Sequence, residues 1–144
     1  MTVISLGKNK QLTTSVDKKP FKGKGAEDWL SRLQRDYQSV IDEMYVLSEA
    51  SKKLSSLPWY LFRHKRSENG QHYLVWRSYG LKQYTITWDK VTPYLAKVPK
   101  EQQAWVLEAQ EQVYLLNMRE LTLRFCISRA EKCLESIQEL DSLQ

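Results

Sequence analysis

Large apolar residues recur at alternating spacings of three and four between Ala26 and about Ser55. This alternation places them along one side of an α-helix. Glu27 and Asp28 fall in its first turn, where carboxylates offset the helix dipole. Pro58 ends the pattern, because the residue before a proline is disfavoured in the α region. A helix is therefore predicted here, with an apolar side made of Leu30, Leu33, Tyr37, Val40, Met44, Leu47 and Leu54.

The pattern changes to strands after this helix. Aromatic and β-branched residues surround an Asn69-Gly70 pair, which is the strongest short-range signal for a two-residue hairpin turn. Gly80-Leu81 predicts a second two-residue turn with glycine first. Three antiparallel strands are therefore predicted, over residues 59–65, 71–78 and 83–88.

A very long helix is predicted from Lys100 to about Glu139, after a short helical connector over residues 91–97. This stretch has no Gly or Pro, and Pro99 precedes it where a helix tolerates proline. Such a helix would span about 60 Å, more than a small sheet can cover. We expect it to pair with the first helix and to bend, break or extend into a partner subunit. Its main apolar stripe is Ala109, Val113, Leu116, Leu123, Ile127, Ala130, Leu134 and Ile137, and a second stripe is Tyr114, Met118, Leu121 and Phe125.

The predicted fold class is α+β: a long N-terminal helix, a three-stranded antiparallel meander, a short connector helix and a very long C-terminal helix, possibly broken. Residues 1–25 lack periodicity and carry six Lys and one Asp, which is typical of a flexible basic arm. Residues 26–144 are predicted to form a single domain.

Charge alternates along the chain. The formal charge is +5 over residues 1–25, −4 over 26–51, +8 over 52–100 and −4 over 101–144. Such separation of basic from acidic segments is typical of a protein with a basic surface that binds an anionic partner. The alternative is that the segments neutralise one another in the folded chain, and the sequence leaves both open.

The chain is expected to be cytoplasmic. No run approaches the roughly 18 apolar residues of a membrane span, and the apolar run from Thr2 to Leu6 is too short for a signal peptide. Cys126 and Cys133 are seven residues apart on a predicted helix, so their Cα atoms are about 10 Å apart. A disulfide needs less than about 7 Å, and free thiols suit a reducing compartment.

Catalytic and metal-binding patterns are not apparent in the sequence. His64 and His72 fall on neighbouring predicted strands without a nearby cysteine, which indicates packing rather than a metal site. The glycines do not fit a phosphate-binding loop, and no nucleophile elbow or Cys–His pair is apparent. The sequence therefore predicts a non-enzymatic protein without a metal or cofactor.

The two faces of the predicted sheet differ in chemistry. With two-residue turns, one face carries Tyr60, Phe62, Tyr73, Val75, Tyr84, Ile86 and Trp88 and is expected to be the core. The other carries Leu61, Arg63, Lys65, His72, Leu74, Trp76, Thr85 and Thr87. Its cations and hydroxyls suit phosphates, and Trp76 could stack on a base. The alternative is that Trp76 and Leu74 pack beneath the long helix, and a register shift of one residue would exchange the faces.

Two stretches of the sequence resemble motifs of a known protein family. The first is Leu57-Pro58-Trp59-Tyr60-Leu61-Phe62-Arg63 with Leu74-Val75-Trp76-Arg77, and the second is Leu116-Asn117-Met118 with Arg129-Ala130-Glu131-Lys132-Cys133. Together they span roughly residues 57–135. This region resembles an uncharacterised bacterial family encoded on integrating conjugative elements, some members of which are labelled integrase regulators. The resemblance implies a mobile-element setting, where neighbouring genes commonly handle DNA, and it implies no binding residues.

The leading hypothesis is a non-enzymatic DNA-binding accessory protein of a mobile genetic element. The expected nucleic-acid-binding residues are Lys18, Lys19, Lys22 and Lys24 in the arm, and Arg63, Lys65, Arg66, Trp76, Arg77, Lys82, Thr85 and Thr87 in the sheet region. The competing hypothesis is a protein-interaction module or regulator that acts through its long amphipathic helices. A homodimer is also expected, through Val113, Leu116, Leu123, Ile127 and Leu134.

Overall fold

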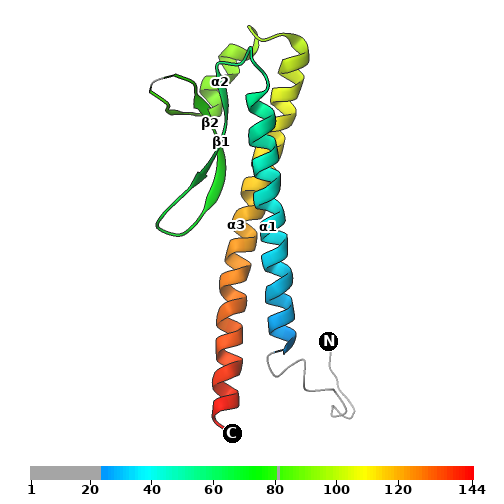
Figure 1. The fold of residues 1–144 in the computed structure, drawn as a ribbon, viewed down its shortest axis with the longest axis vertical. Coiled ribbons are helices and arrows are strands. Elements are labelled where there is room, and N and C mark those ends of the chain that lie inside the picture. The colour runs from blue at the N-terminus through cyan, green and yellow to red at the C-terminus, as the bar shows by residue number, and fades with distance from the viewer. Residues whose placement is uncertain (1–23, 81) are drawn as a thin grey trace. The chain divides into compact units, whose positions relative to one another are not determined.

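The computed structural model describes residues 24–80 and 82–144, so the predicted basic arm lies almost entirely outside the described residues. The elements are α1 (Lys24–Lys52), β1 (Trp59–Lys65), β2 (His72–Ser78), β3 (Thr85–Ile86), α2 (Trp88–Leu95) and α3 (Lys100–Ser142) (Figure 1). The sheet is antiparallel with strand order β1-β2-β3. The predicted α+β class is confirmed.

The described residues divide into two compact units. One unit comprises residues 34–126, and the other comprises residues 24–33 together with 127–144. In the smaller unit, Ala130 is fully buried. All strands, α2 and every contact discussed below belong to the unit of residues 34–126.

Helix α3 is continuous over 43 residues. The predicted alternative of a break within it does not occur, because this stretch has no residue that interrupts a helix. Both cysteines are free. Among the described helices, none is both long and apolar enough to cross a membrane.

The core of the larger unit lies between the sheet and a pair of helices. Within residues 34–126, α1 and α3 run side by side and the strands lie on one side of them (Figure 1). The rings of Trp59 and Trp76 meet edge to face, with centroids 5.0 Å apart. Burial of each such large side chain contributes about 1.5–3 kcal/mol. The core also contains Val40, Met44, Leu57, Leu61, Leu74, Val91, Val98, Val106, Ala109, Val113 and Leu116.

The first hairpin turn contains four residues, not the predicted two. Lys65 pairs with His72, and the Arg66 N–H donates to the Gln71 carbonyl at 2.8 Å. Gly70 adopts a φ of 72°, which favours glycine, and its N–H donates to the Arg66 carbonyl at 2.9 Å. The prediction was therefore out of register by two residues. An even shift leaves the side chains of β1 and β2 grouped on the same faces as predicted.

Strand β3 is only two residues long and is out of register with the prediction by one residue. Ile86 pairs with Trp76, and Thr85 pairs with Arg77. An odd shift moves side chains to the opposite face. Thr85 therefore lies on the face of Arg77, whereas Ile86 shares the face of Trp76.

The predicted choice of core face was wrong. We call the side chains of Trp59, Leu61, Leu74 and Trp76 the inner face, because all four are buried in the core. Trp76 is only 2% exposed, and its indole N–H donates to Gln110 Oε1 at 2.7 Å. The opposite face carries Arg77 on the central strand, with its guanidinium against the Phe62 ring and its Nε buried without a hydrogen-bond partner among the described residues. Burying the rest of this guanidinium in a core would be costly. The alternative that Leu74 and Trp76 pack beneath the long helix is the observed one.

Helix side chains close both free edges of the hairpin. On β1, the Leu61 carbonyl accepts from Ser48 Oγ at 2.7 Å, and the Leu61 N–H donates to Ser51 Oγ at 2.9 Å. On β2, Asn117 Oδ1 accepts from the Leu74 N–H at 2.8 Å, while Asn117 Nδ2 donates to the Leu74 carbonyl at 3.1 Å. These bonds satisfy backbone groups that an added strand would otherwise use. They also fix the sheet to α1 and α3.

Candidate nucleic-acid interface

The face of the sheet that points away from the helices is rich in aromatic rings. We call it the outer face, and its strand side chains are Tyr60, Phe62, His64, Tyr73, Val75, Arg77 and Thr85. Alternation along each strand places these residues opposite the buried inner face. Tyr60 is buried and Thr85 is exposed, and the other five are half-buried.

Ring and cation contacts run along the outer face. The Arg77 guanidinium carbon lies 3.6 Å from the centre of the Phe62 ring. The His64 and Tyr73 ring centroids are 5.0 Å apart, and the Arg66 guanidinium carbon lies 5.6 Å from the Tyr73 ring centre. At the other end of the face, the Tyr60 ring lies 4.8 Å from that of Tyr79, which is 46% exposed. Flat rings beside guanidinium groups are the components of a surface that binds bases by stacking and phosphates by charge.

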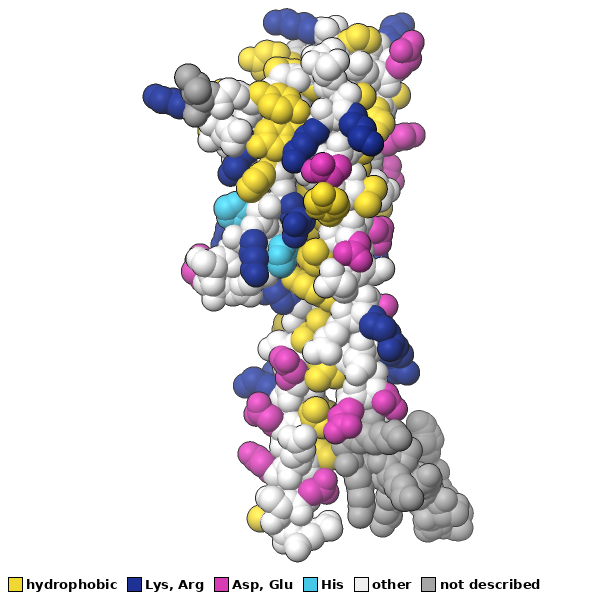
Figure 2. Space-filling view, in the orientation of Figure 1, with side chains coloured by type: hydrophobic (Ala, Val, Ile, Leu, Met, Phe, Trp, Pro, Cys, Tyr) yellow, Lys and Arg dark blue, Asp and Glu magenta, His cyan; other side chains and the backbone are white. Residues whose placement is uncertain are grey.

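The cations of this region lack carboxylate partners. Within residues 24–80 and 82–144, salt bridges join Lys52 to Glu49, Arg119 to Glu43, and Arg124 to Glu120. None involves Arg63, Lys65, Arg66, Arg77 or Lys82. Figure 2 shows Lys and Arg side chains and both histidines gathered over the strands. Apart from the Lys52–Glu49 pair at the segment boundary, the described acidic segments therefore form no ion pairs with the basic segment.

The structure brings only part of the predicted set onto the outer face. Arg77 and Thr85 lie on it, and Arg66 lies at its rim over Tyr73. Lys82 is exposed in the loop before β3. Thr87 is the residue before α2, and its hydrogen bond to Asp89 lowers the pKa of that carboxyl.

The other predicted nucleic-acid-binding residues do not lie on the outer face. Trp76 is in the core, so it cannot stack on a base. Arg63 and Lys65 alternate with the outer-face residues on the helix side of β1, and the Arg63 guanidinium lies 6.0 Å from the Tyr45 ring of α1. Lys24 begins α1, whereas Lys18, Lys19 and Lys22 lie outside the described residues.

The predicted dimer residues do not form one exposed surface. Val113 and Leu116 are buried in the core, so neither is free to contact a second copy. Leu123 packs against that core. Ile127 and Leu134 belong to the other unit and are half-buried. The prediction placed the interface on the stripe of α3 that the sheet and α1 cover.

A buried polar cluster around Glu120 joins α1, β2 and α3. The Glu120 carboxylate is fully buried and accepts from the Tyr37 hydroxyl at 2.7 Å, the His72 backbone N–H at 2.9 Å and Arg124 Nε at 3.2 Å. Tyr37 Oη also lies 3.2 Å from His72 Nδ1. Since the hydroxyl proton points to Glu120, the neutral His72 ring satisfies this second bond by donating from Nδ1.

The cluster also shifts the pKa values of Tyr37 and His72. Burial, followed by the bond to Glu120, raises the pKa of Tyr37 well above its ordinary value. Burial lowers the pKa of His72, and the positive charges of Arg63 and Lys65 lower it further. The carboxylate lies beneath the hairpin with its oxygens engaged by donors from three elements. This arrangement fixes the strand to the helices and offers no free base at a surface.

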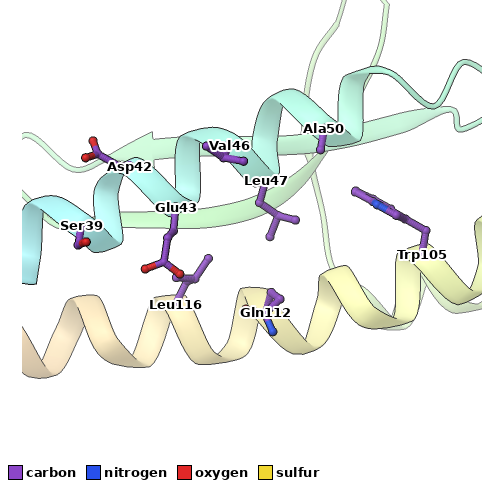
Figure 3. A pocket seen from close by; sticks show the side chains of 9 residues that line it. All are labelled: Ser39, Asp42, Glu43, Val46, Leu47, Ala50, Trp105, Gln112 and Leu116. Atoms are coloured by element: carbon purple, nitrogen blue, oxygen red, sulfur yellow. The ribbon is translucent and has the colours of Figure 1, made fainter.

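A separate groove lies between α1 and α3 on the side that the sheet leaves uncovered (Figure 3). It encloses about 420 Å³ and is lined by apolar side chains including Val46, Leu47 and Trp105. Asp42 and Glu43 also line it, so its charge is unsuited to phosphate. Among the described residues, no group of three or more His, Cys, Asp and Glu is placed to hold a metal ion.

The sequence contained a signal for the aromatic residues of the outer face, although the prediction did not include them in the interface. Tyr60, Phe62 and Tyr73 were grouped together on one face, but that face was assigned to the core. Arg77 was the discriminating residue, because a central cation marks the solvent side of a half-buried sheet. Tyr79 had no strand position in the prediction and reaches Tyr60 only through the observed register.

No protein-family model matches the chain, and comparisons with curated proteins and with solved structures find no match either.

Proposed function

We propose that this protein is a non-enzymatic nucleic-acid-binding accessory protein, and that the outer face is its binding surface. The observation that carries the proposal is that Arg66 and Arg77, which have no acidic partner among the described residues, lie against aromatic rings of the outer face. Cations that are not neutralised within the protein are available to phosphates, and binding phosphates releases condensed counterions. The assignment to a mobile genetic element rests on the resemblance of residues 57–135 alone.

Each group on the outer face has a distinct role in this proposal. Arg66 and Arg77 contact phosphates, with Lys82 at the margin of the face. Tyr73 and Tyr79 provide ring surfaces for bases. The Arg77 guanidinium already lies against the Phe62 ring, which holds the charge in place before a ligand arrives. Phosphate contacts carry no sequence information, so binding is largely independent of sequence.

Fluorescence anisotropy with short labelled oligonucleotides tests the proposal. Single-stranded DNA, its duplex and the corresponding RNA are titrated with the full chain at about 50 mM and about 200 mM salt. We expect binding at the lower salt and a marked loss of affinity at the higher. No binding to any of the three at low salt would overturn the proposal.

Matched variants locate the surface. Removal of one phosphate contact by Arg66→Ala or Arg77→Ala reduces the slope of log affinity against log salt by about 0.7–0.9. Lys90→Ala removes the same charge from an exposed position on α2 and serves as the control. If Lys90→Ala weakened binding as much as Arg77→Ala, the outer face would not be the binding surface.

A further inference from the structure

The second apolar stripe of α3 remains exposed in the folded chain. Its large side chains, which we call the seam, are 47–65% exposed: Leu107, Tyr114, Met118, Leu121 and Phe125. Successive members from Tyr114 to Phe125 are four, three and four residues apart, which is the spacing of a coiled-coil contact. Glu111 interrupts the seam after Leu107, but from Tyr114 to Phe125 the seam is uninterrupted, and exposed apolar patches on soluble proteins mark interaction sites.

The hairpin forms a wall beside the seam. A hollow of about 360 Å³ is lined by Arg66, Gln71 and Tyr73 from the hairpin and by Tyr114, Asn117, Met118 and Leu121 from α3. The seam is therefore one side of an open groove. Asn117 and Glu120 close the edge of β2 above it, so an added β-strand would find its backbone partners already occupied. A helix, whose backbone groups are satisfied internally, suits this groove better than a strand.

We propose that a second copy of α3 occupies the seam in an antiparallel twofold arrangement. The seam is self-complementary when the twofold axis lies between Met118 and Leu121. Tyr114 then faces Phe125 of the other copy, and Met118 faces Leu121. A twofold contact of this kind uses the same patch on both copies, so no second binding surface is needed.

Charge along α3 favours the antiparallel direction. From Glu101 to Met118 the helix carries Glu101, Glu108 and Glu111 and no Lys or Arg, whereas Arg129 and Lys132 follow Phe125 in the sequence. In the antiparallel register, Glu108 lies within one helical turn of Arg129 and Lys132 of the other copy, and Glu131 lies there too. A parallel copy would set Glu108 and Glu111 against their own equivalents, and like charges in register repel. This inference does not rest on the proposed function, although Arg66 and Tyr73 line both the groove and the proposed nucleic-acid surface.

Light scattering coupled to size exclusion tests the inference on the full chain at micromolar concentration. We expect a mass twice the chain mass of 17.0 kDa. Met118→Glu and Leu121→Glu each return the mass to that of one chain, since the seam residues are exposed and their change leaves the core intact. Val46→Glu, at a 67% exposed site on α1, is the matched control and stays dimeric. A wild-type mass of one chain, or a dimer that survives both seam variants, would overturn the inference.

Spin-label distances test the direction. Cys126→Ser and Cys133→Ser first remove the native thiols. A single new cysteine, introduced by Thr122→Cys or Ala104→Cys, then carries the spin label. In the antiparallel arrangement, Thr122 lies near the twofold axis and gives a short distance, whereas the two copies of Ala104 are about 45 Å apart from the helical rise. Circular dichroism confirms that each variant keeps its helix content. Short distances at both sites would indicate a parallel dimer and contradict the proposal.

Discussion

The inner and outer faces of the small sheet both contain aromatic rings but serve different purposes. On the inner face, Trp59 and Trp76 meet in the core, and the indole nitrogen of Trp76 is bonded to Gln110. On the outer face, Arg77 lies against the Phe62 ring and Arg66 lies over Tyr73 at the rim, and neither has an acidic partner in the described part of the chain. Aromatic content alone therefore does not identify a binding surface. Arg66 and Arg77, which lie against outer-face rings, mark the candidate surface.

The largest expected effect is on the free energy of unfolding, and it differs between the two faces. Trp76→Ala removes a fully packed ring and one hydrogen bond, so we expect a loss of about 3–5 kcal/mol in the free energy of unfolding. Tyr73→Ala, on the outer face, removes a half-buried ring and costs under about 2 kcal/mol. Urea denaturation measures both. Equal losses would contradict the assignment of the two faces.

The next effect concerns the closed edge of β2. Asn117→Ala leaves the Leu74 N–H and carbonyl without partners, which costs about 1–3 kcal/mol for each group that stays dry. Hydrogen exchange should show faster exchange of the Leu74 amide, with the Leu61 amide still protected. Ser51→Ala is the control on the opposite edge and should expose Leu61 instead. If Asn117→Ala left the Leu74 amide fully protected, the side chain would not be closing this edge.

A smaller effect depends on pH. The folded chain lowers the pKa of His72 below its ordinary value of 6.5, so folding favours the neutral ring. This contribution to stability is fully present above pH 6.5 and is lost as the pH falls from there through the folded-state pKa. Urea denaturation of the wild type and His72→Gln over this range isolates the effect. We expect stability to fall more steeply with acidification in the wild type than in the variant, and identical slopes would contradict this account of His72.

The smallest effect is expected beside β3, at an exposed ring. Tyr84 is 62% exposed, so Tyr84→Ser should change the free energy of unfolding by less than about 0.5 kcal/mol. Thermal unfolding monitored by circular dichroism measures it. A loss comparable to that of Tyr73→Ala would show that the ring packs in solution against something this structure does not contain.

Much of the fold could be predicted because helices and strands have different apolar periods. The 3–4 spacing located α1 and α3, and the Asn69-Gly70 pair located the hairpin. The turn length and the β3 register could not be predicted, because they depend on how Gly70 closes its turn and on where the short third strand docks. The side chains that close the sheet edges, such as Asn117 and Glu120, gave no periodic signal. Their partners are backbone groups far away in the sequence.

The candidate site was predicted less well than the fold. Cations, hydroxyls and one aromatic ring were expected together on one sheet face, but that ring belongs to Trp76, which fills the core. Both faces offered enough apolar area to form a core, so the apolar pattern alone could not decide between them. The second stripe of α3 was recognised from spacing, whereas its exposure depends on how α1 and the sheet share the helix.

The proposed role of the outer face is tested most directly by photo-cross-linking to an oligonucleotide that carries 5-iodouracil, followed by mapping of the modified peptides. The account predicts cross-links to outer-face rings, above all Tyr73 and Tyr79, which Arg77→Ala reduces and Lys90→Ala does not. Cross-links confined to α1 and α3, with Tyr73 and Tyr79 unmodified, would contradict it.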